Sequence, residues 1–354
     1  MLAVLAVRWQ PRFRSSKLKR SAKDAAAALG AASVIKGRAV KSLVVGAGGM
    51  GGYFGAKLAH AGGEVTFMVR ESSVQHLRDH GIQVFSPDGD FTVRSFHVTD
   101  DPAEVEPVGL VLLCVKSYDL DTLLAALSPV LLMAETVVIP LLNGIGHVPR
   151  MQEAWGADHV LGGLAYTSAH KGEHPGVIHH MKNHGASQIE FGEWRADAAV
   201  SPRCEAIQRL FSQAGVTATA VTDIEQRMWW KLAAFTGSMA FAVARGSKGK
   251  VWSPELRALI CQLVAEVVAV ARAQDITLPD TLPEQQAHFF ENAPAPLKPS
   301  LLIDLEQGRR LEVETTVGFT SRLGKELAVD TRANDFVYAC LKPYANGVES
   351  LPLT

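Results

Sequence analysis

Apolar positions in the first two thirds of the chain follow a rhythm of alternating strands and helices. Continuous apolar runs at Ser42–Val45, Leu110–Val115 and Thr136–Leu142 predict strands that are buried on both faces. Apolar residues recur at helical spacing in the intervening Gly48–Ala61 and Tyr118–Leu127. Because a helix that connects two parallel strands is the βαβ unit, this order predicts an α/β fold with a doubly wound parallel sheet.

Further segments before residue 222 complete this first half. We predict a second strand at Glu64–Val69, a helix at Ser72–His80, and a hairpin in which Ile82–Phe85 pairs with Phe91–Val98 across the turn Pro87-Asp88-Gly89-Asp90. Residues 158–192 predict more strands with glycine-rich turns. A helix at Pro202–Ala214 and a last strand at Val216–Val221 follow.

From Asp223 onward the pattern is helical. Apolar residues keep helical spacing over Asp223–Val243, and Ser253-Pro254-Glu255 is a typical helix start, with serine at the N-cap and proline at the first helical position. It opens a long apolar helix that reaches about Ala273. A proline-rich stretch comes next, with two or three more helices expected after it. We therefore predict a sheet domain over 41–221 and an all-α domain over 222–345.

Charge is distributed unevenly over the 354 residues, although the net charge is only −1. Residues 1–40 hold nine basic residues and one acidic residue, Asp24, and the remainder holds 26 basic and 35 acidic residues. The basic segment is similar to an organelle transit peptide. The alternative is that the gene start was placed too far upstream. We favour this alternative because the first predicted strand begins at Ser42, directly after the basic segment. The acidic remainder argues against nucleic-acid binding.

The cysteines and the apolar stretches indicate the cellular location of the protein. The four cysteines, Cys114, Cys204, Cys261 and Cys340, form no C-x-x-C pair and indicate packed thiols in a reducing compartment. The apolar stretch Leu123–Leu142 is broken by two prolines and a glutamate, so we expect no membrane span. We therefore predict a cytoplasmic protein, or an imported one if 1–40 is a transit peptide. The long helix at 254–273 would suit either a core or a homodimer face.

Five histidines fall within fifteen residues, at His170, His174, His179, His180 and His184. Histidine-rich tracts bind metals in some proteins. Here they lie on predicted strands and turns without a helical i, i+4 pair, and no thiol accompanies them. We expect no metal site.

A glycine motif lies where the first strand meets the first helix. Gly46-Ala47-Gly48-Gly49-Met50-Gly51 fits G-x-G-x-x-G in the expected strand-to-helix context. Glycines let the backbone approach a pyrophosphate, and the helix N-terminus offers free N–H groups. The second strand ends at Arg70, where NAD sites usually carry an acid that binds the ribose 2′-hydroxyl. An arginine suits a 2′-phosphate and predicts NADP(H); a solvated surface arginine is the alternative.

Three more polar residues stand at informative positions. Lys116 and Asn143 directly follow predicted strands, so we expect them at the crevice where α/β sheets bind ligands. A surface lysine and a turn-forming asparagine are the alternatives. Lys231 shares a helix face with Phe235 and Met239. It either extends to solvent or is desolvated in a cleft, where its pKa would fall to a value useful for acid–base chemistry.

These motifs, taken in order, resemble the ketopantoate reductase family (2-dehydropantoate 2-reductases). The resemblance spans about 41–343 and rests on GAGGMGG (46–52), CVKSYD (114–119), LNGIG (142–146), MWWKL (228–232) and SLLIDLEQGRRLEVE (300–314). It implies a Rossmann domain followed by an all-α domain, with the active site between them.

The resemblance also implies roles at the cofactor. Lys116 and Arg70 match contacts to NADP, and Asn143 matches an asparagine that touches both cofactor and substrate. Ser168 matches a backbone position near the cofactor.

On the substrate side, the resemblance makes Lys231 the catalytic lysine, which donates a proton to the carbonyl being reduced. Ser300 matches a contact to the substrate carboxylate, and Glu312 a residue near the nicotinamide ribose and the substrate. Family members active on ketopantoate usually carry asparagine four and eight residues after the lysine, where this chain has Phe235 and Met239. Because sites built on hydrogen bonds discriminate strongly, this departure points to a different, more apolar substrate.

Three functions follow. The first is NADPH-dependent reduction of a 2-oxo acid to a 2-hydroxy acid, with 2-dehydropantoate or a related compound as substrate. The second is an opine- or 3-hydroxy-acid-type dehydrogenase. The third is a non-catalytic NADP-binding sensor, against which the retained Lys231 and Glu312 argue.

Overall fold

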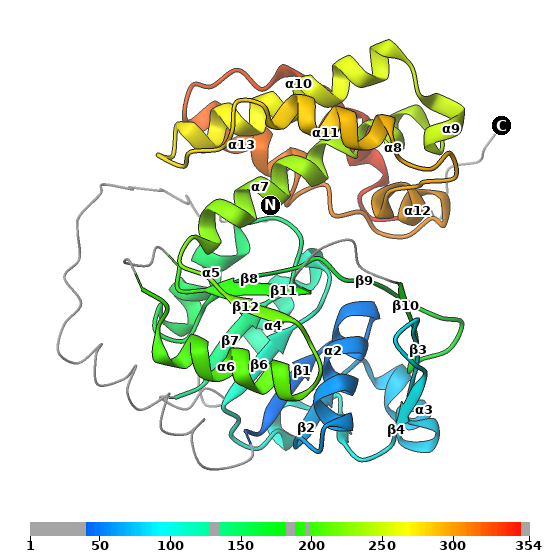
Figure 1. The fold of residues 1–354 in the computed structure, drawn as a ribbon, viewed down its shortest axis with the longest axis vertical. Helices are drawn as coiled ribbons and strands as arrows, with labels where there is room; N and C mark the ends of the chain where they lie inside the picture. Colours follow the sequence, from blue (N-terminus) through cyan, green and yellow to red (C-terminus); the bar gives the residue numbers. More distant parts are fainter. Residues whose placement is uncertain (1–39, 128–134, 182–187, 195–198, 348–354) are drawn as a thin grey trace, which may run out of the picture.

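The computed structural model describes residues 40–127, 135–181, 188–194 and 199–347. Most of the basic segment 1–40, as well as His184, therefore lies outside the described residues. Figure 1 shows the described chain as two stacked parts, with the sheets and their helices in one and only helices in the other. No helix of the described ranges is both long and apolar enough to cross a membrane.

A five-stranded parallel sheet forms the centre of the first part. In spatial order its strands are β5 (His97–Thr99), β2 (Val65–Met68), β1 (Ser42–Val45), β6 (Leu110–Leu113) and β7 (Val137–Pro140). In the central register, Val44 of β1 lies between Phe67 and Leu112. The strand order reverses between β1 and β6, which is the position where α/β sheets bind ligands at their carboxyl ends. The predicted doubly wound sheet is confirmed.

Helices cover both faces of this sheet because successive strand residues point to opposite sides. The side of Val44 packs with Phe54 and Phe211, and the side of Leu43 and Val45 packs with Met151 and other apolar residues. The helices of this part are α2 (Gly49–His60), α3 (Glu71–His80), α4 (Leu120–Ala126), α5 (His147–Trp155) and α6 (Pro202–Gln213).

Two smaller sheets extend the first part. One has the order β4 (Phe91–Val93), β3 (Ile82–Phe85), β10 (Val177–Met181) and β9 (Ser168–Lys171). The other has the order β12 (Ala218–Ala220), β11 (Ile189–Gly192) and β8 (Gly162–Ala165).

The expectation of one strand over Phe91–Val98 is wrong. The segment forms β4, which pairs antiparallel with β3, and β5, which pairs parallel with β2. Because the two ends belong to different sheets, the chain must bend between them. At the bend, Arg94 donates a hydrogen bond to the carbonyl of Asp79, at 3.0 Å.

The second part is helical from Ile224 onward. Its helices are α7 (Ile224–Gly237), α8 (Ala240–Ala244), α9 (Lys248–Val251), α10 (Pro254–Arg272), α11 (Leu282–Glu291), α12 (Ser300–Glu306), α13 (Val317–Glu326) and α14 (Arg332–Leu341). The predicted start of α10 is confirmed, since the Ser253 hydroxyl accepts from the Leu256 N–H and Pro254 occupies the first turn.

Two details differ from the expected helices. The predicted single helix over Asp223–Val243 is split into α7 and α8. Helix α11 lies inside the proline-rich stretch, where no helix was predicted. Pro283 sits in its first turn, where the missing N–H of proline costs nothing.

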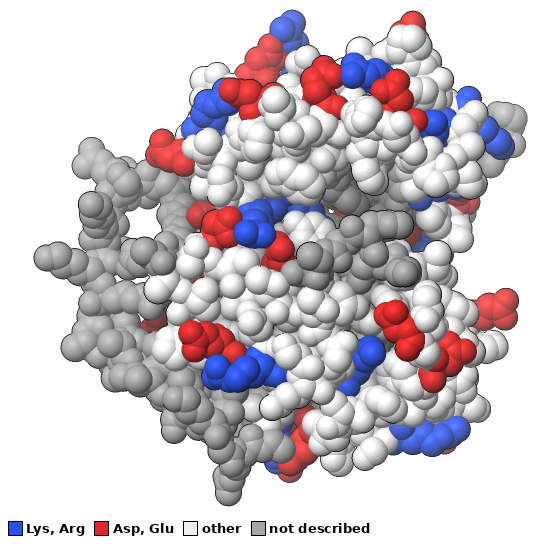
Figure 2. All heavy atoms as spheres, viewed as in Figure 1, with Lys and Arg blue, Asp and Glu red and all other residues white. Residues whose placement is uncertain are grey.

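The two parts share a core. Met228 and Leu232 of α7 and Val264 of α10 pack in the same cluster as Leu43 and Met151 from the sheet side. A separate cluster around Phe241 and Ile260 serves the helical part alone. On the face shown in Figure 2, basic and acidic side chains are interspersed rather than gathered in one patch of a single sign. Helix α7 thus contributes apolar residues to the core that the two parts share.

Candidate active site

A cleft of about 570 Å³ opens at the carboxyl ends of β1, β2 and β6. Gly46, Ala47 and Gly48 line it as the loop between β1 and α2. Gly46 has a φ of +91°, and a Cβ there would lie 2.9 Å from the carbonyl oxygen of Cys114. A Cβ on Gly51 would lie 1.9 Å from the Gly46 carbonyl oxygen. The loop therefore needs glycine at both positions to turn tightly against β6.

The other residues of the glycine motif belong to the helix that follows the loop. Gly49, Met50 and Gly51 form the first turn of α2 and do not line the cleft. A Cβ on Gly49 would lie 2.1 Å from the carbonyl oxygen of Ala169, so α2 starts in close contact with β9. Ser168, the exposed first residue of β9, stands beside this contact but does not line the cleft.

Arg70 lies at the rim of the cleft, just after β2. Its exposed guanidinium donates to the Asp119 carboxylate at 3.0 Å. Asp119 also pairs with Arg310 at 3.7 Å, and the Arg310 guanidinium stacks on the Tyr118 ring with its centre 4.1 Å from the ring centroid. Of these four residues, only Arg70 was predicted individually from the sequence. The rest became visible only when the fold brought α12 and its following loop over η2 (Ser117–Asp119).

Glu312 is the centre of the hydrogen bonds across the cleft. This buried carboxylate accepts from the Lys116 ammonium at 3.1 Å, the Asn143 amide at 3.0 Å and the Ser117 backbone N–H at 3.1 Å. The Lys116 ammonium also pairs with Asp304 at 3.0 Å. Burial alone would lower the pKa of Lys116, but the carboxylates of Glu312 and Asp304 raise it above its ordinary value. The structure thus brings together three of the predicted site residues.

Lys231 faces a narrow niche beside this group. The niche is lined by Leu142, Asn143, Gly144, Leu164, Met228, Lys231, Leu232 and Phe235. The Lys231 ammonium donates to the carbonyl of Ala165 at 2.8 Å. Burial lowers its pKa to about 8, while the negative charge of Glu312 acts in the opposite direction. An amine with such a pKa exchanges protons readily near neutral pH.

The two departures from the family pattern occupy different environments. Phe235 lines the niche, so its ring stands where a hydrogen-bonding side chain is usual in the family. Met239 is fully buried, and its sulfur accepts from the Thr316 hydroxyl at 3.5 Å. Only Phe235 therefore changes the lining of the niche. The expectation that both positions face the substrate does not match the buried place of Met239.

Ser300 begins α12 and stands apart from the niche. It lines a second, apolar cavity of about 540 Å³ that also reaches Lys231 and Phe235. The cavity and the niche thus meet at the same two residues of α7.

His147, which was not predicted from the sequence, follows the LNGIG motif as the first residue of α5. Its ring is buried, and neither ring nitrogen has a hydrogen-bond partner among the residues that the structure describes. Burial lowers its pKa to about 3, and the nearby charge of Lys231 acts in the same direction. His147 is therefore neutral at physiological pH, and no sequence signal distinguishes it from a turn residue.

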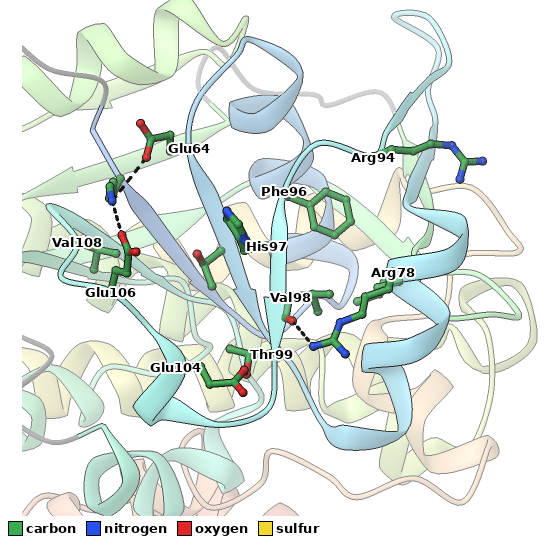
Figure 3. A pocket seen from close by; sticks show the side chains of 13 residues that line it. Glu64, Arg78, Arg94, Phe96, His97, Val98, Thr99, Glu104, Glu106 and Val108 are labelled. Carbon is green, nitrogen blue, oxygen red and sulfur yellow. Dashed lines mark hydrogen bonds and ion pairs between the residues drawn. The ribbon is translucent and has the colours of Figure 1, made fainter.

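A further cavity, of about 530 Å³, lies along the edge strand β5 and the amino ends of β1 and β2 (Figure 3). Glu64 and Glu106 both pair there with Lys41, and Arg78 donates to the carbonyl of Val98 at 3.2 Å. Since α/β sheets bind nucleotides at the carboxyl ends of their strands, this cavity is not the candidate cofactor site.

The described histidines of the cluster lie on β9, on β10 and in the turn between them, where His170 and His174 are exposed and His180 is buried. The rings of His170 and His179 stack with centroids 5.3 Å apart. Within the described ranges, no group of three or more histidine, cysteine or carboxylate side chains is placed to hold a metal ion.

Comparison with known proteins agrees with this geometry. The fold and the cleft, together with the similarities that follow, define an oxidoreductase that acts on CH–OH groups. Family models described as ketopantoate reductase PanE/ApbA and its C-terminal part match 42–196 and 223–345. The chain belongs to the ketopantoate reductase family, which confirms the resemblance seen in its motifs.

Individual relatives are distant. The uncharacterized oxidoreductase YkpB of Bacillus subtilis is 28% identical over 309 residues, covering 86% of this chain and 99% of that protein. The 2-dehydropantoate 2-reductase of Halobacterium salinarum is 31% identical over 284 residues, covering 79% of this chain and 90% of that protein.

Solved structures show the same architecture. A 2-dehydropantoate 2-reductase from Geobacter metallireducens has a TM-score of 0.77 and 28% identity, covering 86% of this chain and 99% of the other. D-mandelate dehydrogenase in complex with NADH and anilino(oxo)acetate has a TM-score of 0.75 and 24% identity, covering 86% of this chain and 98% of the other. At that identity the likeness concerns the fold alone.

Proposed function

We propose that the protein reduces a 2-oxo acid to the corresponding 2-hydroxy acid with NADPH, as in the conversion of 2-dehydropantoate to pantoate. The observation that carries this proposal is Lys231, whose amine has a pKa of about 8 and lies in a niche lined also by Asn143. The niche adjoins the group around Glu312, which reaches the cleft at Lys116.

The cleft residues fit a dinucleotide. The backbone of Gly46, Ala47 and Gly48 would approach the pyrophosphate, while Gly49, Met50 and Gly51 supply the free N–H groups of the α2 N-terminus. Arg70 would exchange Asp119 for the 2′-phosphate of NADPH. Lys116 would hold a cofactor phosphate or ribose. Ser168 stands near the start of α2, and its backbone would contact the cofactor.

The substrate side uses fewer groups. When bound, the cofactor supplies a hydride to the ketone carbon. Lys231 donates its proton to the carbonyl oxygen and stabilises the charge that develops there, which leaves a neutral amine that regains a proton from solvent. Asn143 and Glu312 orient the carbonyl and the nicotinamide end, and Ser300 contacts the substrate carboxylate. The overall reaction consumes one 2-oxo acid, one NADPH and one proton.

This function assigns roles to both parts of the chain. A nucleotide-binding domain over 41–221 would hold the cofactor, and a helical domain over 222–345 would supply the catalytic lysine. A homodimer and a cytoplasmic location stay predictions from the sequence.

One observation favours the second candidate, an opine- or 3-hydroxy-acid-type dehydrogenase. Phe235 removes a hydrogen-bonding group from the niche, and these substrates place their carboxylate differently. A panel of 2-oxo and 3-oxo acids, followed by NADPH absorbance, separates the two functions.

The test of the catalytic role is Lys231→Ala. We expect the variant to lose turnover by a factor of about 100 or more, the size typical of a lost general acid, while it binds NADPH normally. Lys250→Ala, at an exposed lysine of α9, is the matched control. Equal turnover of Lys231→Ala and wild type would refute the role, and NADPH binding without reduction of any ketone would favour the sensor.

A further inference from the structure

The apolar cavity beside the niche has the character of a ligand site. It lies between α7 and α11 and is bounded by the segment that leads into α12. Its aromatic residues are Tyr166, Trp230, Phe235, Phe289 and Phe290. A volume of about 540 Å³ and an aromatic lining with few polar groups are typical of sites for small organic molecules.

Gln286 points independently to a ligand in this cavity. It lines the cavity with only 7% of its surface exposed, and its side-chain amide has no hydrogen-bond partner in the part of the chain that the structure describes. Unlike the ring nitrogens of His147, the Gln286 amide is not fully enclosed, so it reaches the open space of the cavity, where a ligand can bind it. The neighbouring Gln285 differs, because its amide donates to the Thr281 hydroxyl at 3.0 Å.

Phe289 gives a third observation. Its side chain is 60% exposed although it is a large apolar group at the cavity. Its ring meets Phe290 edge to face, with centroids 5.2 Å apart. Exposed aromatic residues that continue into a buried apolar lining mark binding surfaces. Phe336 has a similar exposure of 57% on α14 but does not line this cavity.

The position of the cavity relates it to the proposed reaction. Lys231 and Phe235 line both the cavity and the niche, so a molecule whose carbonyl lies at Lys231 would extend its substituent among the aromatic residues. A short substituent with a hydroxyl would lose its water there and meet the Phe235 ring, which offers no hydrogen bond of comparable strength. A flat apolar substituent would lose nothing.

Resting on the proposed function, we propose that the substrate is a 2-oxo acid with an aryl-sized apolar side chain, and that the cavity holds this side chain. Gln286 donates a hydrogen bond to the carboxylate of the same molecule. Ser300 contacts the other carboxylate oxygen. The site is therefore built against the short, hydroxyl-bearing side chain of 2-dehydropantoate.

The experiment compares kcat/KM for phenylpyruvate, 2-dehydropantoate and pyruvate with NADPH as the reductant. We expect phenylpyruvate to exceed 2-dehydropantoate by about tenfold or more, as one well-formed apolar pocket allows. Phe289→Ala should lower kcat/KM for phenylpyruvate about tenfold, a clearly larger loss than for pyruvate. The matched control, Phe336→Ala, should change none of the three substrates.

Binding of the product tests the cavity without turnover. Calorimetry should show that 3-phenyllactate binds more tightly than pantoate. It should also show that the Gln286→Leu substitution weakens the binding of 3-phenyllactate. A preference for 2-dehydropantoate, or an equal loss on all substrates in Phe289→Ala, would overturn the aryl assignment while leaving the reductase function intact. Tight binding of 3-phenyllactate without reduction of any 2-oxo acid would keep the aryl site and refute the reductase function.

Discussion

Lys116 and Glu312 stand 196 positions apart in the chain, yet the lysine ammonium lies 3.1 Å from the glutamate carboxylate. Lys116 follows β6 of the central sheet, and Glu312 belongs to the loop between α12 and α13. The same carboxylate accepts hydrogen bonds from Asn143 and from the Ser117 backbone. One buried group of the helical part thus fixes three donors of the sheet part.

Glu312→Gln should disturb this arrangement without changing its shape. We expect kcat/KM to fall about 10–100-fold, because a neutral amide holds these three donors, one of them the Lys116 ammonium, less well than a carboxylate does. The pKa of Lys231 should fall below about 8, since the charge of Glu312 normally raises it. Values of kcat and kcat/KM, measured as a function of pH, check both effects. Glu306→Gln, which removes an exposed partner of Lys298, should leave the profile unchanged.

The pKa of Lys231 sets the pH dependence of the wild-type enzyme. Reduction needs the protonated amine, so its kcat should fall as the pH rises through about 8. Oxidation of the 2-hydroxy acid needs the neutral amine, so its kcat should rise over the same interval. Rates in both directions, measured between about pH 6.5 and 9.5 with saturating cofactor, check the assignment. A flat profile for reduction would remove Lys231 from the proton transfer.

Arg70 should decide the preference between the two nicotinamide cofactors. In Arg70→Glu the cationic partner of the 2′-phosphate is lost and a repulsive charge takes its place, so the ratio of kcat/KM for NADPH to that for NADH should fall about 10–100-fold. Arg94→Glu is the matched control, because Arg94 lines the separate cavity of Figure 3. An unchanged ratio in Arg70→Glu would contradict the assignment of the 2′-phosphate.

Two neighbouring glycines of the motif should respond differently to alanine. A Cβ on Gly49 would lie 2.1 Å from the Ala169 carbonyl oxygen, whereas a Cβ on Gly48 meets nothing within 4 Å. We expect Gly49→Ala to lower the free energy of unfolding by about 1–3 kcal/mol, because backbone must move to make room. Gly48→Ala should leave it within about 0.5 kcal/mol of wild type. Chemical denaturation checks both values, and similar losses in the two variants would contradict the packing argument.

The sequence predicted the order of strands and helices well because buried parallel strands are continuous apolar runs. It failed at Phe91–Val98, where apolar alternation persists although the chain passes from one sheet to another. It also missed α11, because a proline in a first turn reads locally as a break. Periodicity records local burial and carries no information about which sheet a strand joins.

Some residues of the candidate site could also be predicted from the sequence, and others could not. Lys116 and Asn143 could be found from their positions after strands, and Glu312 only through the family resemblance. Gln286 and Arg310 gave no signal, since their importance depends on what α11 and the loop after α12 face in the folded chain. The burial of Met239 could not be predicted either. Helical spacing shows which residues share a face of one helix, but it does not show which other segment, here the one with Thr316, packs against that face.

The shared carboxylate of Glu312 also limits how such enzymes can be recombined. A chimera that joins this sheet part to the helical part of a relative would keep Lys116 and Asn143 in place only if the incoming loop brought a carboxylate to the same point. Exchange of one half alone would leave donors facing an empty or mismatched acceptor. The two halves are therefore expected to be inherited, and engineered, as a matched pair.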